Sequence, residues 1–328
     1  MRDMKKVRIY SGKEMVNSPV PTVRFRVDGL LRRMGGRMAI TAPLKQEKSM
    51  LAHDLGLKIA AGGEWLGYRT MAGNVLYVNL EIASPMFQKR TQDIQGDQHF
   101  DLDALDRFRA VTILDENLDI DLGIEKVQRI LASCREQDFH VDVLILDPRA
   151  RLISGNENEG TVINQFCENV DKLLKKHPRL SVVIVTHMGK NWSRGAIGHS
   201  RFSGWLDSEI MLTRTPGFEK RKSAEVNARY CEGTSFSIDF TYPIHRLSPE
   251  DEEARKVKVN TAGKYILKHL VGKSISEQDL RNNARKVNIT EYAFQAAIRE
   301  LKTQEKIETL PAGGKGNKKL LRLVNDKK

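Results

Sequence analysis

Lys48 and Ser49 are neighbouring residues whose side chains suit the binding of a triphosphate and its metal ion. They lie in TAPLKQEKSML, residues 41–51, which partly matches the phosphate-binding loop pattern of Gly, four residues, Gly, Lys and Ser or Thr. Ala42 and Glu47 occupy the two glycine positions, so the loop has less freedom to adopt positive φ and carries a carboxylate beside the phosphates. We expect reduced ATP affinity, and we expect Glu47→Gly to raise it. The residues expected to contact ATP are Ala42, Pro43, Lys45, Gln46, Glu47, Lys48, Ser49 and Met50.

Three more polar residues, Glu81, Asp147 and His187, end apolar runs of the kind that form buried parallel strands. The runs are VLYVNLE (75–81), VDVLILDP (141–148) and LSVVIVTH (180–187). Because the carboxyl ends of parallel strands meet at one edge, we expect these side chains near Lys48. Asp147 could then hold Mg²⁺ with Ser49, Glu81 could deprotonate the attacking water, and His187 could sense the γ phosphate. The alternative is that each residue merely ends a strand and that the loop is an ordinary turn.

An alternation of strands and helices is expected to position these residues. An apolar strand at 37–41 precedes the loop, and a helix at 49–61 follows it. Helices at 124–135 and 162–176 separate the later apolar runs. Three further extended segments are 209–214, 224–230 and 235–241. This order is typical of an α/β fold with a mostly parallel central sheet covered by helices.

Several stretches of the segment 22–243 together match one known family. They are VDGLL, APLKQEKSMLAHDLGLKIAAG, GNVLYVNLE, VLILDPRARL with NENEG, and VVIVTH followed by RGAIGHSRFSGWLDS. On these stretches the chain resembles the RecA/KaiC type of P-loop ATPase core, in the branch of RepA-like plasmid and phage replicative helicases. The resemblance implies a RecA-like fold, ATP and Mg²⁺ as cofactors, and ATP hydrolysis coupled to movement on DNA during replication.

The resemblance also implies roles for single residues. Lys48 and Ser49 would bind nucleotide and magnesium, as the loop pattern already indicates. Asp147 would be the magnesium residue, with Glu81 as general base and His187 as sensor. The family further implies a homo-oligomer, such as a hexameric ring. In such a ring the candidates for an arginine that reaches a neighbouring subunit's γ phosphate are Arg201 and Arg214.

Two loops of the core are expected to contact single-stranded DNA. In the RecA class the segments after the third and fourth strands line the central channel, and here these are 148–160 and 188–201. In the second loop, Lys190 and Arg194 could track phosphates while Trp192 stacks on a base. The alternative is that Trp192 is a packed lid over the nucleotide.

Nearly all of the net charge of +12 lies at the C-terminal end of the chain. Residues 255–328 hold 18 Lys and Arg against 7 Asp and Glu, a net charge of +11. A basic segment of this kind favours nucleic-acid contact over a merely solvated tail. We expect a basic N-terminal segment at 1–21, an ATPase core at 22–246, an acidic linker at 247–256 and a DNA-binding domain at 257–328.

The segment 257–328 has the pattern of a winged helix. A helix at 262–270 is followed by a second one that begins near Ser276, which is spaced from Asp279 as in a capping box. A third helix begins near Thr290. The residues expected to contact duplex DNA are Tyr292, Gln295 and Arg299 on the outward face of this third helix, and Lys315, Lys318 and Lys319 in the wing. Such domains can instead mediate protein contacts.

Two function classes remain open. The first is an oligomeric DNA-dependent ATPase, which the presence of Glu81, Asp147 and His187 favours. The second is a RecA-like core that binds nucleotide without useful turnover and serves as a DNA-binding initiator, loader or regulator, which Glu47 favours.

Composition excludes several other classes. No apolar run is long enough to span a membrane, and the N-terminal stretch lacks the apolar block of a secretory signal. Cys134, Cys167 and Cys231 are too few and too far apart for a disulfide framework or a zinc cluster. We therefore expect a soluble, cytoplasmic protein with no membrane partner.

Overall fold

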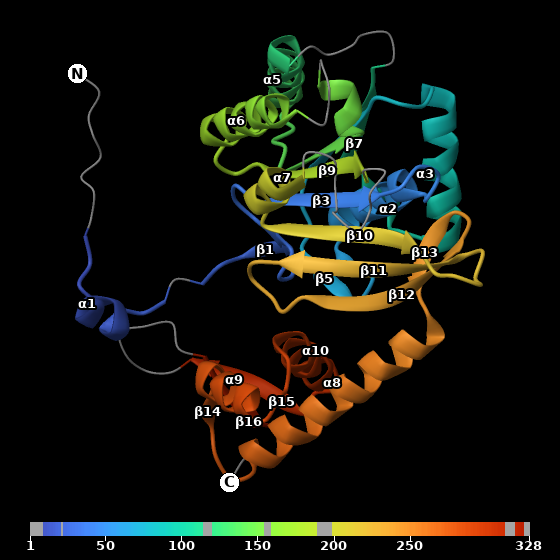
Figure 1. The fold of residues 1–328 in the computed structure, drawn as a ribbon. Helices are drawn as coiled ribbons and strands as arrows, with labels where there is room; N and C mark the ends of the chain where they lie inside the picture. Colours follow the sequence, from blue (N-terminus) through green and yellow to red (C-terminus); the bar gives the residue numbers. More distant parts are fainter. Residues whose placement is uncertain are drawn as a thin grey trace.

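The chain folds into a large α/β core and a smaller C-terminal domain, which Figure 1 shows below the core. The computed structural model describes residues 9–20, 22–113, 120–153, 159–188, 199–311 and 319–324, without the side chains of 120–124 and 199–200. Helix α8 (Pro249–Leu270) runs from the core into the C-terminal domain. None of the helices in these ranges is both long and apolar enough to cross a membrane.

The central sheet of the core has nine strands in the order β13-β12-β11-β10-β3-β9-β8-β6-β7. The six strands from β10 to β7 in this order are parallel to one another, and β11, β12 and β13 continue the sheet in antiparallel fashion beyond β10. Their bounds are β3 Arg37–Ala42, β6 Val75–Asn79, β7 Phe108–Thr112, β8 Val143–Asp147, β9 Ser181–His187, β10 Ser208–Arg214, β11 Arg221–Ala228, β12 Thr234–Thr241 and β13 Ile244–Leu247. The prediction of an α/β fold with a mostly parallel sheet is confirmed.

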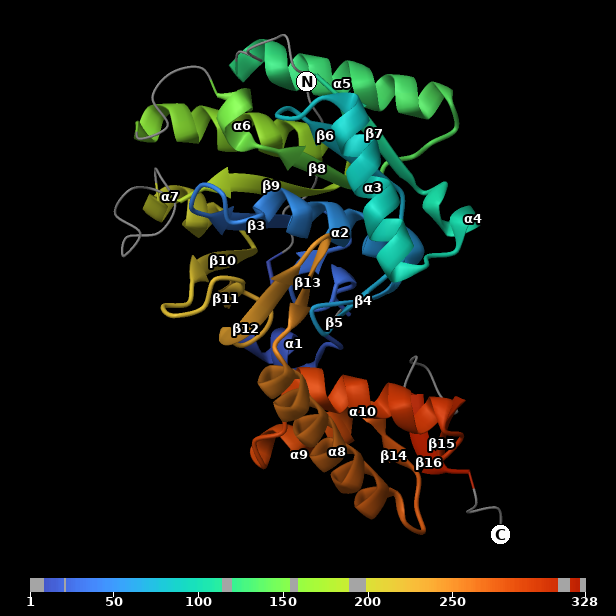
Figure 2. The same ribbon diagram turned by 90° about the vertical axis from the view of Figure 1, so that its right-hand side faces the viewer.

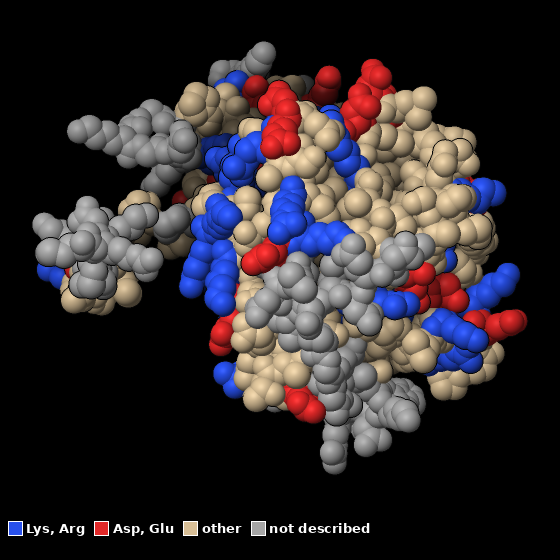
Figure 3. Space-filling model, turned by 90° about the horizontal axis from the view of Figure 1, so that it is seen from above, with Lys and Arg blue, Asp and Glu red and all other residues tan. Residues whose placement is uncertain are grey.

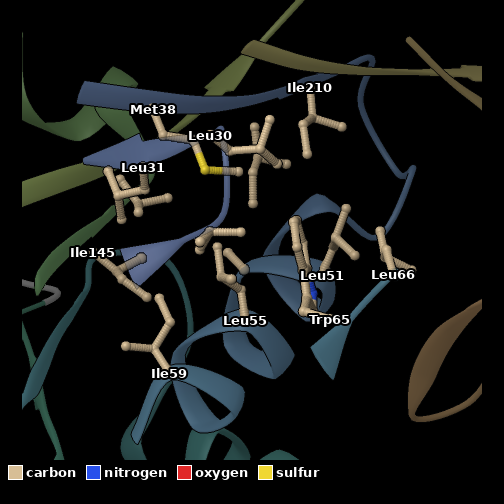
Figure 4. Close-up of a cluster of buried hydrophobic side chains, with 14 of the residues drawn as sticks. Leu30, Leu31, Met38, Leu51, Leu55, Ile59, Trp65, Leu66, Ile145 and Ile210 are labelled. Atoms are coloured by element: carbon tan, nitrogen blue, oxygen red, sulfur yellow. The ribbon is translucent and has the colours of Figure 1, made fainter. Parts of the chain in front are cut away.

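The parallel strands are buried on both faces, which explains their near-continuous apolar runs. All five residues of β6 and all five of β8 are buried. In β3, Met38 belongs to the apolar cluster on the side of α2 (Lys48–Ala61), whereas its neighbour Ala39 belongs to the cluster on the other side. Figure 4 shows the first of these clusters, with Leu51 of α2 and Ile145 of β8 among the labelled side chains. The alternation along each strand therefore closes two cores at once.

Helices cover both faces of the sheet. The helices α5 (Ile120–Glu136), α6 (Gly160–Lys176) and α7 (His199–Trp205) lie on one side. On the other side α2 packs on the strands, and α3 (Ser84–Gln98) and α4 (Leu102–Leu105) contact α2. A short 3₁₀ helix, η1 (Arg149–Leu152), follows β8.

A second, four-stranded sheet flanks the core in the order β2-β1-β5-β4. Its strands are β1 Phe25–Val27, β2 Leu31–Arg32, β4 Gly63–Trp65 and β5 Tyr68–Thr70. Trp65 is only 1% exposed and packs in the same cluster as α2. Before this sheet lies the short helix α1 (Gly12–Asn17), none of whose residues is buried. These elements were not predicted from the sequence.

The C-terminal domain packs three helices on a small sheet with the order β14-β16-β15. Its elements after α8 are β14 Ile275–Ser276, α9 Glu277–Lys286, α10 Glu291–Thr303, β15 Ile307–Pro311 and β16 Lys319–Leu323. Ser276 is the N-cap of α9 as predicted, but its side chain makes no capping hydrogen bond. The Thr290 hydroxyl accepts a hydrogen bond from the Ala293 N–H and so caps α10.

Two sequence-based boundaries differ from the structure. Most of the expected linker, 247–256, forms the beginning of the 22-residue helix α8, which starts at Pro249, whereas Leu247 ends β13. The Ser248 hydroxyl caps this helix, and Glu250, Asp251 and Glu252 in its first turn interact favourably with the helix dipole. The strand β6 ends at Asn79, two residues before Glu81, because the Asn79 side chain turns the chain there, as described below.

Candidate nucleotide site

The loop between β3 and α2 keeps a strongly bent backbone without glycine. Lys45 and Glu47 both have positive φ, 56° and 50°, and Glu47 is the left-handed N-cap of α2. A non-glycine residue in this region costs roughly 1 kcal/mol. Ala42 is fully buried at the end of β3, and Met50 packs against Ile244 of β13. The conformation that glycine would adopt freely is therefore held here by the surrounding structure.

Lys48, Ser49 and Asp147 come together at the carboxyl edge of the sheet, as predicted. The Ser49 hydroxyl donates to Asp147 Oδ1 at 3.1 Å, although 98 residues separate the two in the sequence. Tyr77 of β6 donates its hydroxyl to the other oxygen, Asp147 Oδ2. Lys48 and Asp147 are 5% and 3% exposed. The loop helix and the strands β6 and β8 thus build one compact polar cluster.

Burial dominates the electrostatics of this cluster. It lowers the pKa of Lys48, although the carboxylates of Asp147 and Glu81 act in the opposite direction. Burial also raises the pKa of Asp147, against the hydrogen bonds from Tyr77 and Ser49. Glu81 adds to this rise, so its carboxylate lies near enough to Lys48 and Asp147 to act on both. A cation in the cluster would stabilise both carboxylates.

Glu81 is exposed in a bend just after β6. The Asn79 Oδ1 accepts hydrogen bonds from the N–H groups of Glu81 and Ile82, at 3.3 and 3.2 Å. The Asn79 side-chain amide donates in turn to the Ile82 carbonyl and to Thr112 of β7. Asn79 therefore fixes the turn that carries Glu81. An Asn two residues before a Glu is a turn signal in the sequence. The prediction that the strand ends at Glu81 does not take this signal into account.

His187 ends β9 directly beside the start of the loop. It pairs with Ala42 in the parallel register, and the Met188 N–H donates to the Ala42 carbonyl at 3.0 Å. The predicted position of His187 at the shared edge is confirmed, whereas its role as sensor stays a prediction. Arg201 on α7 and Arg214 at the end of β10 are both exposed, and their roles also stay predictions.

Lys222 of β11 is a site residue that the sequence analysis missed. Its Nζ lies 2.7 Å from Glu47 Oε2, the carboxylate at the second glycine position. Tyr77 was missed for a similar reason, since nothing in an apolar run shows that one hydroxyl meets a carboxylate on the next strand. Both contacts depend on sheet order, and no local pattern marks them.

The donor set at Ser49 and Asp147 fits Mg²⁺, because this ion prefers hydroxyl and carboxylate oxygens. Both oxygens lie at the N-terminus of α2, where the helix dipole and the free N–H groups also favour a phosphate. The Asp147 carboxylate is almost completely buried, and a bound cation would offset the cost of keeping it charged there. Ser49 and Asp147 would hold such an ion, which would supply positive charge to neutralise the phosphates of ATP.

The predicted DNA contacts on α10 are placed differently from the expectation. The Tyr292 ring lies 6.3 Å from the Tyr68 ring of β5, with the Arg255 guanidinium 5.0 Å above it. Arg299 pairs with Asp28 of the core at 3.6 Å. The expectation that Tyr292 and Arg299 point outward is wrong, because both side chains contact residues of the core. Figure 2 shows α10 on the side of the C-terminal domain that lies toward the core.

Among the other predicted DNA contacts, two residues are described by the structure and five are not. The Gln295 side chain, also on α10, donates to Glu291, and Lys319 is exposed at the start of β16. Five predicted residues, Lys190, Trp192, Arg194, Lys315 and Lys318, lie outside the described residues. Figure 3, which looks down on the molecule from above Figure 1, shows basic and acidic side chains both present on that face.

Comparison with known proteins places the core in a family. A family model described as an AAA domain matches residues 12–193, more than half of the chain, so the chain belongs to this family. The match contains the phosphate loop, Glu81, Asp147 and His187, and it ends before β10. No curated protein matches the chain.

Proposed function

We propose that this AAA-domain protein is a DNA-dependent ATPase of the RepA-like replicative helicase type, which couples ATP hydrolysis to movement on DNA. The ATPase part follows from the family and from the polar cluster at the sheet edge. The helicase part rests on the resemblance of the segment 22–243 to that family branch. A homo-oligomer, such as a ring, belongs to the same proposal.

The hydrogen bond from Ser49 to Asp147 is the observation that carries the proposal. It joins the hydroxyl after the loop lysine to the carboxylate at the end of β8, which are the two groups that hold magnesium in P-loop ATPases. A strand-to-helix turn with no function would have no reason to keep Lys48 and Asp147 buried beside each other, because buried charges are costly.

The proposed roles follow from position. Lys48 would bind the β and γ phosphates, together with the N–H groups at the start of α2. Ser49 and Asp147 would hold magnesium, and Glu81 would orient and deprotonate the attacking water. The exposure of Glu81 suits a base that must meet water, whereas the burial of Asp147 suits a fixed ligand.

The C-terminal domain would bind duplex DNA as a winged helix. The order of its elements, with three helices, a sheet β14-β16-β15 and a connection between β15 and β16, agrees with that pattern. Tyr292 and Arg299 contact the core, so DNA binding through α10 would require that these contacts open. Lys319 is already exposed, so DNA could reach it without the opening of these contacts.

One observation favours a second candidate function, a nucleotide-binding initiator, loader or regulator with little turnover. Glu47 occupies the second glycine position with a left-handed backbone. A carboxylate there weakens ATP binding unless a cation compensates it. This candidate shares the nucleotide site and differs only in the rate of hydrolysis.

ATP turnover with and without single-stranded DNA separates the two candidates, paired with a mass measurement of the oligomer. The proposal predicts turnover that single-stranded DNA stimulates, together with an oligomer in the presence of ATP. Bound ATP without turnover under both conditions would support the second candidate instead.

A further inference from the structure

Lys222 is an almost completely buried cation beside the phosphate loop. It lies opposite Arg214 in the β10–β11 pair, and its side chain is only 4% exposed. The Nζ contacts Glu47 Oε2 at 2.7 Å and lies 5.1 Å from the ring of Phe240 on β12. A lysine buried to this degree needs a compensating charge, and Glu47 supplies it.

Glu47 places a negative charge in the phosphate loop. It immediately precedes Lys48, so its backbone lies in the part of the loop that would face a bound triphosphate. An uncompensated negative charge a few ångströms from the phosphates would repel them strongly in a partly buried site. The Glu47 side chain instead extends to β11, where Lys222 neutralises it.

We propose that Glu47 and Lys222 form a compensated pair, in which Lys222 acts as a positioning residue for the phosphate loop. Lys222 draws the carboxylate toward β11 and cancels its charge, so that a loop without glycine still accepts ATP. The inference rests on the proposed function for the binding of ATP, whereas the ion pair itself is given by the structure.

The two partners differ in exposure, and this difference makes the pair testable. Glu47 is 34% exposed, so water can solvate its carboxylate when Lys222 is replaced. Lys222 at 4% exposure has no such access, so removal of the carboxylate leaves a buried cation. Glu47→Gln should therefore destabilise the protein more than Lys222→Met, whose long apolar side chain fits the space beside Phe240.

The experiment compares Glu47→Gln, Lys222→Met, the double variant and Lys220→Met, which removes a charge from an exposed lysine two residues away. ATP and ADP affinities are measured by calorimetric titration, and the melting temperature is measured without nucleotide. Lys222→Met should weaken ATP binding by about 10- to 100-fold, and ADP binding by less, because the free carboxylate repels the larger charge more. Glu47→Gln should lower the melting temperature by several degrees but leave ATP affinity equal or higher.

The double variant decides the inference. Restored ATP affinity and a restored melting temperature support the compensated pair, since both charges are then absent. If wild type binds ATP but Lys222→Met binds it equally well, or if Glu47→Gln fails to restore affinity in the double variant, the inference is overturned and Lys222 has another role. If wild type binds no ATP at all, the proposed function itself is overturned, which is a distinguishable result.

Discussion

The core and the C-terminal domain differ in whether polar and charged side chains are buried. In the core, charged groups such as Lys48, Asp147 and Lys222 are buried at the carboxyl edge of the sheet. In the C-terminal domain, across 249–311 and 319–324, no polar or charged side chain is buried, and the interior is entirely apolar. Because buried charge is costly, this difference supports the proposal that the chemistry takes place in the core and that the C-terminal domain acts through its surface.

Burial alone does not mark a functional site. Arg26 pairs with Asp142 at 2.8 Å, and both side chains are nearly or fully buried. Asp142 lies just before β8, at the end of the strand opposite to Asp147. That pair joins the small sheet to the core and is structural. The position at the carboxyl edge, together with the phosphate loop, distinguishes the cluster around Asp147.

The largest expected effect comes from Lys48. Replacement by Ala removes the buried cation beside Asp147 and Glu81, so ATP affinity should fall at least about 100-fold. Calorimetric titration with Mg-ATP measures this, with Lys175→Ala, which removes an exposed lysine of α6 outside the nucleotide site, as control. Equal affinity of Lys48→Ala and wild type would show that the buried charge of Lys48 has no part in nucleotide binding. The difference in burial between the core and the C-terminal domain would then not mark the nucleotide site.

The buried carboxyl of Asp54 tests the cost of burying a charge separately from the chemistry of the nucleotide site. Burial raises the pKa of Asp54 to about 7, and the side chain lines a cavity of about 230 Å³. The folded protein thus binds this proton more tightly than the unfolded chain does, so stability is highest below pH 4 for this group and falls as the pH rises toward 7. Asp54→Asn should remove this penalty and stabilise the protein at pH 8 by at most about 4 kcal/mol.

Denaturant unfolding at pH 5 and pH 8 measures this difference, with Asp106→Asn at an exposed position as control. ATP affinity should be unchanged in Asp54→Asn. A stability gain that is equal at both pH values would show that the Asp54 carboxyl does not titrate in this range.

Tyr77 should have a smaller effect. Replacement by Phe removes the hydroxyl that donates to Asp147 and leaves that carboxylate with less support, at a cost of about 1.5–3 kcal/mol of unfolding free energy. Urea unfolding of Tyr77→Phe beside Tyr230→Phe, which alters an exposed ring, checks this. A change no larger than that of the control would mean that the hydroxyl contributes nothing to the cluster.

The smallest effect is expected between the two domains. Arg299→Gln removes an ion pair with Asp28 in which both side chains are partly exposed, so unfolding free energy should change by less than about 1 kcal/mol. The same variant tests the surface role of the C-terminal domain through binding of duplex DNA at low and moderate salt. Unchanged DNA binding would remove Arg299 from the proposed DNA contacts.

Seven of the nine strands of the central sheet, with Lys48, Glu81, Asp147 and His187 at its edge, could be predicted because the signals are local, whereas β7 and β13 were not predicted. Apolar runs end at or near Glu81, Asp147 and His187, and parallel strands bring such ends together whatever lies between them. Lys222 and Tyr77 could not be predicted in the same way, because their partners depend on which strands become neighbours. Whether Tyr292 faces solvent or the core depends on how the C-terminal domain packs against the core. Helix periodicity does not predict that arrangement. The start of α8 was signalled by Ser248 and the acidic residues after it, but was interpreted as a linker.

The central claim is that the edge formed by Lys48, Ser49, Asp147 and Glu81 hydrolyses ATP. Phosphate release under single-turnover conditions, measured for wild type and Glu81→Gln at saturating Mg-ATP, tests it most directly. We expect equal ATP affinity and a hydrolysis rate at least about 100-fold lower in Glu81→Gln, because the general base is lost. Equal rates in the two proteins would contradict it.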